Sequence, residues 1–508
     1  MAEHFERNSR TYALVTVLSR VTGLARDATL SRVLGAGAVM DTFFFAFIIP
    51  NLFRRLFGEG ALSAAFLRVY AQLDTSDRDT ARRLATLTIG LLAAGLGALT
   101  IAGELLLYWL SARAGHDQLV VRLLMIMLPY MPMICLVAIL GAMLQVHGRF
   151  GPSAGAPIVL NLFIIGATIG VAPMLGVRDA GVHVTVVAAS VTVAGAAQLA
   201  WMTWALGARR WHMAGWRRAV EPLRTVVGQA VPMILGLGVL QLNVLLDGVL
   251  ASYPTLVGPT IFGVEYPLHE GAMAAVSFAA RLYQFPLAVV GLAVATAIFP
   301  ALARLADDER SFSEVLQRGL RLVIFIGLPA SAGLMLVGPL LVRVILEGGR
   351  FGAADVDRVA FVLYGYAAGV WAYSTIHVIT RGFYAMGDTR TPVTVAVAMV
   401  ALNLVLNCVL IWTPLREAGL AWSTAVCAVI QFAVLLGLAR RRLPAASIGP
   451  VLSFGAKALA LTGVMTVAVA VVLRLMPAGT WLEALFALVV GTGTGVLVVG
   501  LGKWAIRH

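Results

Sequence analysis

Apolar residues fill most of this chain in long runs that short polar segments separate. A helix that crosses the hydrocarbon core of a bilayer needs about 20 predominantly apolar residues. The pattern predicts an all-α polytopic membrane protein with fourteen transmembrane helices. The predicted spans are residues 12–34, 41–68, 84–111, 119–146, 155–176, 181–205, 227–252, 271–302, 315–345, 357–380, 392–413, 418–438, 452–474 and 481–502.

Composition agrees with this prediction and excludes a water-soluble enzyme. Of 508 residues, 60% are hydrophobic and only 12% are charged, whereas soluble proteins carry about 25% charged residues. No P-loop or nucleophile-elbow spacing occurs in the sequence, so we do not expect an enzyme. The net charge of +13 would suggest a nucleic-acid partner in a soluble chain. In a membrane protein it indicates basic cytoplasmic loops instead, and no nucleic acid is expected.

Arginines gather in every second loop between the predicted spans. Arg78, Arg82 and Arg83 lie in one such loop and Arg149 in another, while the alternate loops hold only scattered cations such as Arg178. Cytoplasmic loops carry the excess of Lys and Arg. The pattern therefore predicts that both termini are cytoplasmic, which an even number of spans allows.

Short matches suggest an internal repeat with an offset near 240 residues. The matching segments are 63–66 with 296–299, 149–152 with 390–392, and 180–181 with 418–419. Each match is weak alone, but three in order predict two halves of six spans each. Repeats with an even number of spans are parallel, and their substrate site is expected between the halves near mid-membrane.

Three arginines in predicted spans have few acids around them, namely Arg20, Arg26 and Arg281. A charge near the bilayer centre costs about 2.5–3.5 kcal/mol on insertion scales. Ion pairs and snorkelling explain many such charges. For these three we favour anion binding, because the planar guanidinium suits phosphate or carboxylate.

Other charges in the first two spans have opposite charges nearby. They are Asp27 beside Arg26, and Asp41, Arg54, Arg55 and Glu59 in the second span. For Asp27, Arg55 and Glu59 we expect salt bridges that lock helices together.

A possible sodium site would combine Asp247 with Asn403, Asn407 and Ser423. Four oxygen donors from three spans could hold a hard cation. Hydrogen bonds between helices explain the same residues and are the preferred interpretation. No other cofactor is expected.

The arginine cluster lies in a longer motif. The run SRVTGLARDATLSRVLGAGAVMDTFFFAFIIPNLFRRLFGEGALSAAF at 19–66 closely resembles the opening signature of the MurJ (MviN) family of lipid II flippases, in the MOP exporter superfamily. RFGPSAGAP, ARLYQFP and GDTRTPV extend the resemblance along the chain.

The resemblance implies two six-helix lobes around a central cavity, with two further helices that form a groove for the lipid tail. We assign the N-lobe to residues 1–222, the C-lobe to 223–445 and the groove to 446–508. It also implies the bacterial cytoplasmic (inner) membrane as location and membrane lipids as surroundings. We expect a protein that works as a monomer.

The implied substrate is lipid II, the undecaprenyl-diphosphate-linked disaccharide pentapeptide, moved to the outer leaflet by alternating access. The implied cavity charges include substrate-binding arginines and gating acids: Arg20, Arg26, Arg54, Arg55 and Arg281, with Asp27, Asp41 and Glu59. In one departure from many relatives, Ala280 replaces an acid before Arg281.

Three alternatives remain at this point. A flippase for another polyprenyl-diphosphate-linked glycan fits the charges equally well. A MATE-like multidrug exporter for cationic drugs should have acids in its cavity rather than arginines. A membrane scaffold would use the arginines only to join helices.

Overall fold

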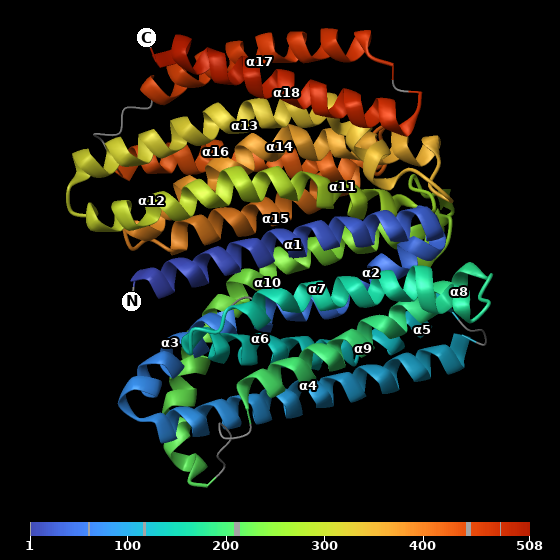
Figure 1. Ribbon diagram of the computed structural model, residues 1–508, viewed down its shortest axis with the longest axis vertical. Helices are drawn as coiled ribbons and strands as arrows, with labels where there is room; N and C mark the ends of the chain where they lie inside the picture. Colours follow the sequence, from blue (N-terminus) through green and yellow to red (C-terminus); the bar gives the residue numbers. More distant parts are fainter. Residues whose placement is uncertain are drawn as a thin grey trace. The chain divides into compact units, whose positions relative to one another are not determined.

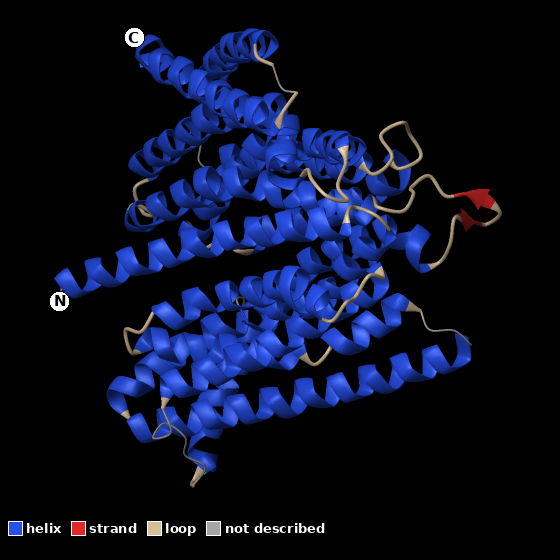
Figure 2. Ribbon diagram, turned by 45° about the vertical axis from the view of Figure 1, so that its right-hand side comes forward, coloured by secondary structure: helices blue, strands red, loops and turns tan. Residues whose placement is uncertain are grey.

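The computed structural model describes residues 2–58, 61–114, 118–207, 214–442, 449–477 and 479–507, and these residues are almost entirely helical (Figures 1 and 2). This confirms the predicted all-α class, since the strands form one short antiparallel hairpin. The elements are α1 (Ala2–Leu34), α2 (Ala38–Phe53), η1 (Arg54–Gly58), α3 (Ala61–Ser76), α4 (Arg78–Ala114), α5 (Leu119–Met127), α6 (Tyr130–Val146), α7 (Gly151–Gly166), η2 (Ala167–Val171), α8 (Ala172–Met174), α9 (Ala180–Leu206), η4 (Trp216–Ala219), α10 (Val220–Leu256), β1 (Thr260–Ile261), β2 (Val264–Glu265), α11 (Ala272–Leu287), η5 (Ala288–Leu292), α12 (Ala293–Arg304), α13 (Glu309–Leu346), α14 (Ala353–Ala385), α15 (Arg390–Leu410), α16 (Ala418–Arg442), α17 (Gly449–Leu475) and α18 (Trp481–Arg507).

Ten helices among the described residues are long and apolar enough to cross a membrane. They correspond to the predicted spans 3–6 and 9–14. The other four predicted spans are also helical, in α1, in α2–α3, in α10 and in α11–α12. Each of those four contains at least one of the charged residues singled out from the sequence. The chain is thus a multi-pass membrane protein, and the count of fourteen spans stays a prediction.

Three predicted spans contain a π-helical turn. These turns are η1, η2 and η5, in the second, fifth and eighth predicted spans. Pro50 precedes η1 and Pro286 precedes η5, each inside its helix. A proline has no N–H for the helix ladder and crowds the preceding turn. The chain stays helical past both prolines.

Packing divides the chain into two compact units, residues 1–258 and 259–508. In the first unit α1 packs along α7, and α9 packs on α6 and α7. Helix α10 packs against α2 and α3 and so belongs to this unit. The lobes predicted at 1–222 and 223–445 follow the internal repeat instead, and they stay a prediction beside this division by packing.

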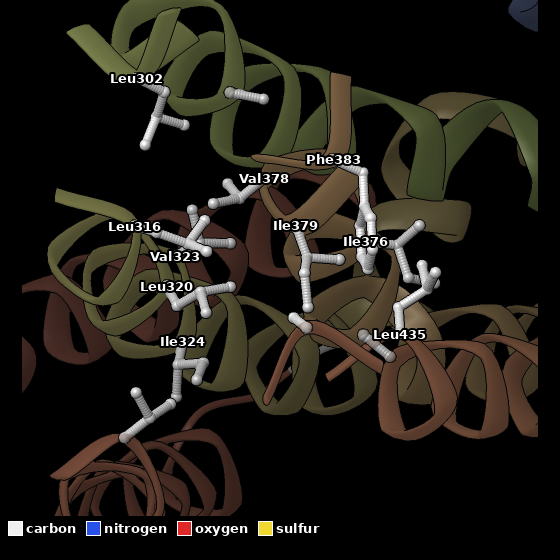
Figure 3. Close-up of a cluster of buried hydrophobic side chains, with 14 of the residues drawn as sticks. Leu302, Leu316, Leu320, Val323, Ile324, Ile376, Val378, Ile379, Phe383 and Leu435 are labelled. Carbon is white, nitrogen blue, oxygen red and sulfur yellow. The ribbon is translucent and has the colours of Figure 1, made fainter. Parts of the chain in front are cut away.

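The core of the second unit lies where α13, α14 and α16 meet. Leu316, Val323, Ile379, Phe383 and Leu435 are among its buried members (Figure 3). Burying an aliphatic or aromatic side chain of this size stabilises a fold by about 1.5–3 kcal/mol in water. In a bilayer, close packing takes over much of that role.

Glycines allow α14 and α16 to approach closely. A Cβ atom on Gly365 would lie 2.8 Å from the Cβ of Ala421, and one on Gly369 would lie 3.0 Å from the Cα of Ala425. Small residues at such positions bring helix backbones together in membranes. Helix α14 is consequently the most buried candidate span among the described residues.

Candidate functional site

Arg26 lies at the centre of a buried polar network that joins α1 to α7. Its Nε and Nη2 donate to Oδ1 of Asp27 at 2.9 and 2.7 Å, and its Nη1 donates to Oδ1 of Asn161 at 3.0 Å. Arg26 is 6% exposed and Asp27 is 2% exposed. Arg26 therefore has an acidic partner in this conformation, in the neighbouring residue Asp27. Burial at this depth requires such a partner, because an unpaired charge away from water is costly.

Asn161 is a member of the site that sequence reasoning missed. Its Nδ2 donates to the Thr22 hydroxyl at 3.1 Å and to the Ser19 carbonyl at 3.3 Å, so it binds α1 at three positions. It is 4% exposed. The only indication in the sequence was its place in the repeat, where Leu160-Asn161 matches Leu402-Asn403. A neutral amide in an apolar run gave no reason to prefer it over other polar residues.

Arg20 lies on the same helix, six residues and about 9 Å along the axis from Arg26. Its side chain is exposed. Within the described part of the chain it makes no hydrogen bond or ion pair. On α1, Arg26 thus has a hydrogen bond at each of its three guanidinium nitrogens, whereas Arg20 is exposed and open to an incoming anion.

The charges of the second predicted span lie on α2 and on the π turn that follows. Asp41 is fully buried and accepts a hydrogen bond from Thr255 of α10, at 3.2 Å from Oδ2. Arg54 and Arg55 are half-buried in η1, and Nε of Arg54 donates to Oδ1 of Asn51 at 2.9 Å. Glu59 lies outside the described residues. Asp41 therefore joins α2 to α10 in this conformation.

Arg281 belongs to the second unit, on α11, and is half-buried. Ala280 before it is also half-buried. Five residues further along, Pro286 precedes the π turn η5. Arg54 and Arg55 lie inside the π turn η1, whereas Arg281 lies about two helical turns before η5.

Three of the four residues predicted to bind sodium come together between α15 and α16. Asn403 donates to the Ser423 hydroxyl at 3.2 Å, Asn407 donates to Oδ1 of Asn403 at 3.0 Å, and Ser423 donates to Oδ1 of Asn407. All three are buried. The fourth, Asp247, belongs to the first unit, where it accepts from Asn243 at 3.4 Å. Each oxygen of the three-residue ring accepts a bond within the ring, which favours hydrogen bonding between helices over a cation site.

Comparisons with known proteins identify the family. The model of the family described as lipid II flippase MurJ matches residues 30–491. A protein of Vibrio cholerae serotype O1 named probable lipid II flippase MurJ is 33% identical over 442 residues, which are 83% of this chain and 80% of the relative. A Rhizobium tropici protein of the same name is 34% identical over 426 residues, which are 81% of this chain and 76% of the relative.

Solved structures agree on the fold. A structure described as lipid II flippase MurJ in an inward closed conformation has a TM-score of 0.77 at 19% identity, covering 98% of this chain and 99% of that one. An inward-facing multidrug resistance MATE family transporter of the MOP superfamily has a TM-score of 0.64 at 15% identity, covering 85% and 98%. Since the family model spans most of the sequence and close relatives exceed 30% identity, the chain belongs to the MurJ family.

Proposed function

We propose that this protein flips lipid II from the cytoplasmic to the outer leaflet of the bacterial inner membrane. The observation that carries the proposal is the match to the lipid II flippase family over residues 30–491. Membership of a flippase family also confirms the expectation that the chain is not an enzyme. Lipid II is the substrate, and the protein works as a monomer with both termini in the cytoplasm.

The proposed mechanism is alternating access with arginines as diphosphate ligands. Arg20 is exposed and offers the first contact for an anion entering the cavity. Arg26 becomes available when a diphosphate replaces Asp27 and Asn161 as its acceptor. A diphosphate carries more charge than one carboxylate, so this exchange is electrostatically reasonable. Arg281, Arg54 and Arg55 complete the set of substrate-binding cations.

Acidic residues then serve as gate partners. Asp27 receives Arg26 again once the headgroup has left, and this is the pairing present here. Asp41 holds α2 to α10 through Thr255. A ligand drives a conformational change only if it binds the two states differently. The exchange of partners at Arg26 supplies that difference.

The membrane potential can supply energy for the step. Moving negative charge outward across an inside-negative membrane is downhill by roughly 2.3 kcal/mol per charge per 100 mV. Sodium remains a candidate for resetting the transporter, but binding at Asn403, Asn407 and Ser423 would require their hydrogen-bonded ring to open.

A reconstituted system tests the function directly. Purified protein in liposomes should move lipid II between leaflets in a potential-dependent manner, and the gene should restore growth to bacteria depleted of their own flippase. Equal transport of a polyprenyl diphosphate that carries an unrelated glycan would favour the broader substrate class. Transport of cationic drugs without lipid II transport would overturn the proposal.

A further inference from the structure

A cavity of about 540 Å³ lies in the first unit, apart from the Arg26 network. It is lined by residues 148–152, between α6 and α7, and by Trp201, Trp204 and Ala205 near the end of α9. These residues include the RFGP motif, for which flipping gives no role. The cavity lies where three predicted spans end or begin, at the arginine-rich side that the charge pattern assigns to the cytoplasm.

Arg149 supplies the positive charge of this cavity. It is exposed, and its Nη1 donates to the Ala205 carbonyl at 2.6 Å. The last carbonyls of a helix have no partner within the helix, so this bond both caps α9 and fixes the guanidinium. An arginine has five N–H donors. Among the described residues no other acceptor for Arg149 is found, so most of its donors are available to a ligand.

Two tryptophans give the cavity an apolar wall. Trp201 packs over α7 at Gly155, where a Cβ would lie only 2.9 Å from its ring. Trp204 is 80% exposed. Tryptophan is enriched at membrane–water interfaces, where its ring contacts the upper part of lipid chains. A cation beside an exposed indole at this level matches a lipid with an anionic headgroup.

In the second unit, the turn between α14 and α15 is the equivalent of the turn between α6 and α7, and an acidic side chain there pairs with a basic one. Gly148 and Gly387 both have positive φ in the two turns, and the next N–H, of Arg149 or Asp388, donates to the carbonyl five residues earlier. Asp388 therefore corresponds to Arg149. There, Asp388 accepts from the Thr391 N–H at 3.0 Å and pairs with Arg442 at the end of α16. In the first unit Arg149 stands in place of that carboxylate, and it lines the cavity. The residues that line it provide a cation without an acid.

We propose that this cavity binds the phosphate of an anionic phospholipid from the surrounding leaflet. Arg149 contacts the phosphate, and an acyl chain lies against Trp204. Basic pockets between helices on the cytoplasmic side are suited to such headgroups. Free phosphate shares the headgroup chemistry but has no chain to cover the exposed indole. The proposal does not depend on lipid II transport, because lipid binding is measured without it.

Lipid retention by the purified protein tests the proposal. After delipidation, the protein is titrated with phosphatidylglycerol or phosphatidylcholine and examined by native mass spectrometry. We expect preferential retention of phosphatidylglycerol, weakened about tenfold by Arg149→Ala, as for the loss of one charge-assisted contact worth about 1.4 kcal/mol. Arg178→Ala is the matched control, since Arg178 is exposed at the other end of α9, and it should leave retention unchanged.

A second measurement tests lipid binding without changing Arg149, in case Arg149→Ala unfolds the end of α9. Brominated phosphatidylglycerol should quench wild-type tryptophan fluorescence more than brominated phosphatidylcholine, and Trp204→Phe should remove that difference. Equal retention or quenching by both lipids would overturn the proposal. So would displacement of the lipid by millimolar inorganic phosphate, which would indicate a site for a soluble anion.

Discussion

The guanidinium of Arg26 on α1 donates to the side-chain oxygen of Asn161 on α7, 3.0 Å away and 135 residues further along the chain. Asn161 in turn donates to Ser19 and Thr22, so both of its polar groups bind α1. Any anion that binds the guanidinium of Arg26 in this conformation competes with Asn161 as well as with Asp27. Substrate binding and the packing of α1 on α7 are thereby linked.

Asn161→Ala should weaken this link. We expect a loss of about 0.5–1.5 kcal/mol of stability from the missing hydrogen bonds, measured by thermal unfolding in detergent, together with altered lipid II affinity. Asn403→Ala is the matched control, because Asn403 is a buried asparagine in the second unit that also bonds to a neighbouring helix. The control should lose similar stability while lipid II affinity is retained. Equal effects on affinity would mean that Asn161 acts only through general packing.

An exchange of charges, Arg26→Asp with Asp27→Arg, separates ion pairing from substrate binding. The pair keeps both charges in adjacent positions, so a scaffold that needs only the salt bridge should still work. A diphosphate ligand at position 26 would be lost. We expect the double variant to insert normally and to fail in complementation of flippase-depleted cells.

Single substitutions provide the controls for that exchange. Arg26→Ala removes one member of a buried ion pair, which costs about 3–5 kcal/mol, so its expression level must be compared with that of the double variant. Arg178→Ala should complement fully. Growth restored by the double variant would contradict the role of Arg26 as a diphosphate ligand.

The ring of Asn403, Asn407 and Ser423 makes a prediction about sodium. If hydrogen bonding is its role, replacing sodium by potassium should leave the unfolding temperature unchanged, and Ser423→Ala should lower stability by about 1 kcal/mol. If the ring binds sodium, the ion should raise the unfolding temperature of the wild type. Ser423→Ala should then abolish that increase, and the hydrogen-bonding interpretation would be wrong.

The carboxyl of Asp388, in a loop outside the predicted spans, should make the stability of the protein depend on pH. Hydrogen bonds from the side chain and backbone of Thr391, with the nearby charge of Arg442, hold the pKa of the Asp388 carboxyl below its usual range. A lowered pKa in the folded state adds stability above the unfolded value near pH 4. That stability is lost as the pH falls through the folded pKa.

Thermal unfolding between pH 3 and 7 measures this contribution. The wild type should exceed Asp388→Asn in stability at pH 7, and the difference should shrink toward pH 3. Asp307→Asn, at an exposed position, should follow the wild type across the range. A constant difference between the wild type and Asp388→Asn would show that the carboxyl acts through its shape rather than its charge.

Hydropathy was sufficient to predict the helices, because a bilayer requires long apolar segments whatever their partners. The repeat also predicted where helices begin, since α9 starts at Ala180 and α16 at Ala418. The site was harder to predict. Arg26 and Asp27 were identifiable because charge in an apolar run is costly. Asn161 was not, because its role depends on which helix packs against α1.

Irregular turns were also beyond the sequence pattern. Nothing in the sequence indicates the π turn η1, into which α2 continues past Pro50. An ideal helical wheel assumes 3.6 residues per turn throughout, so the face that Arg55 occupies in η1 does not follow from the sequence.

The π turns η1, η2 and η5 each contain one residue more than an α-helical turn of the same height. If that extra residue moves along the helix, the stretch between its old and new positions rotates by about 100° about the helix axis, while the segments outside that stretch stay in place. The predicted spans 2, 5 and 8 can thus reorient the side chains of one stretch without moving their ends. A helix of this kind has a means of changing which of its side chains face a neighbouring helix by axial rotation.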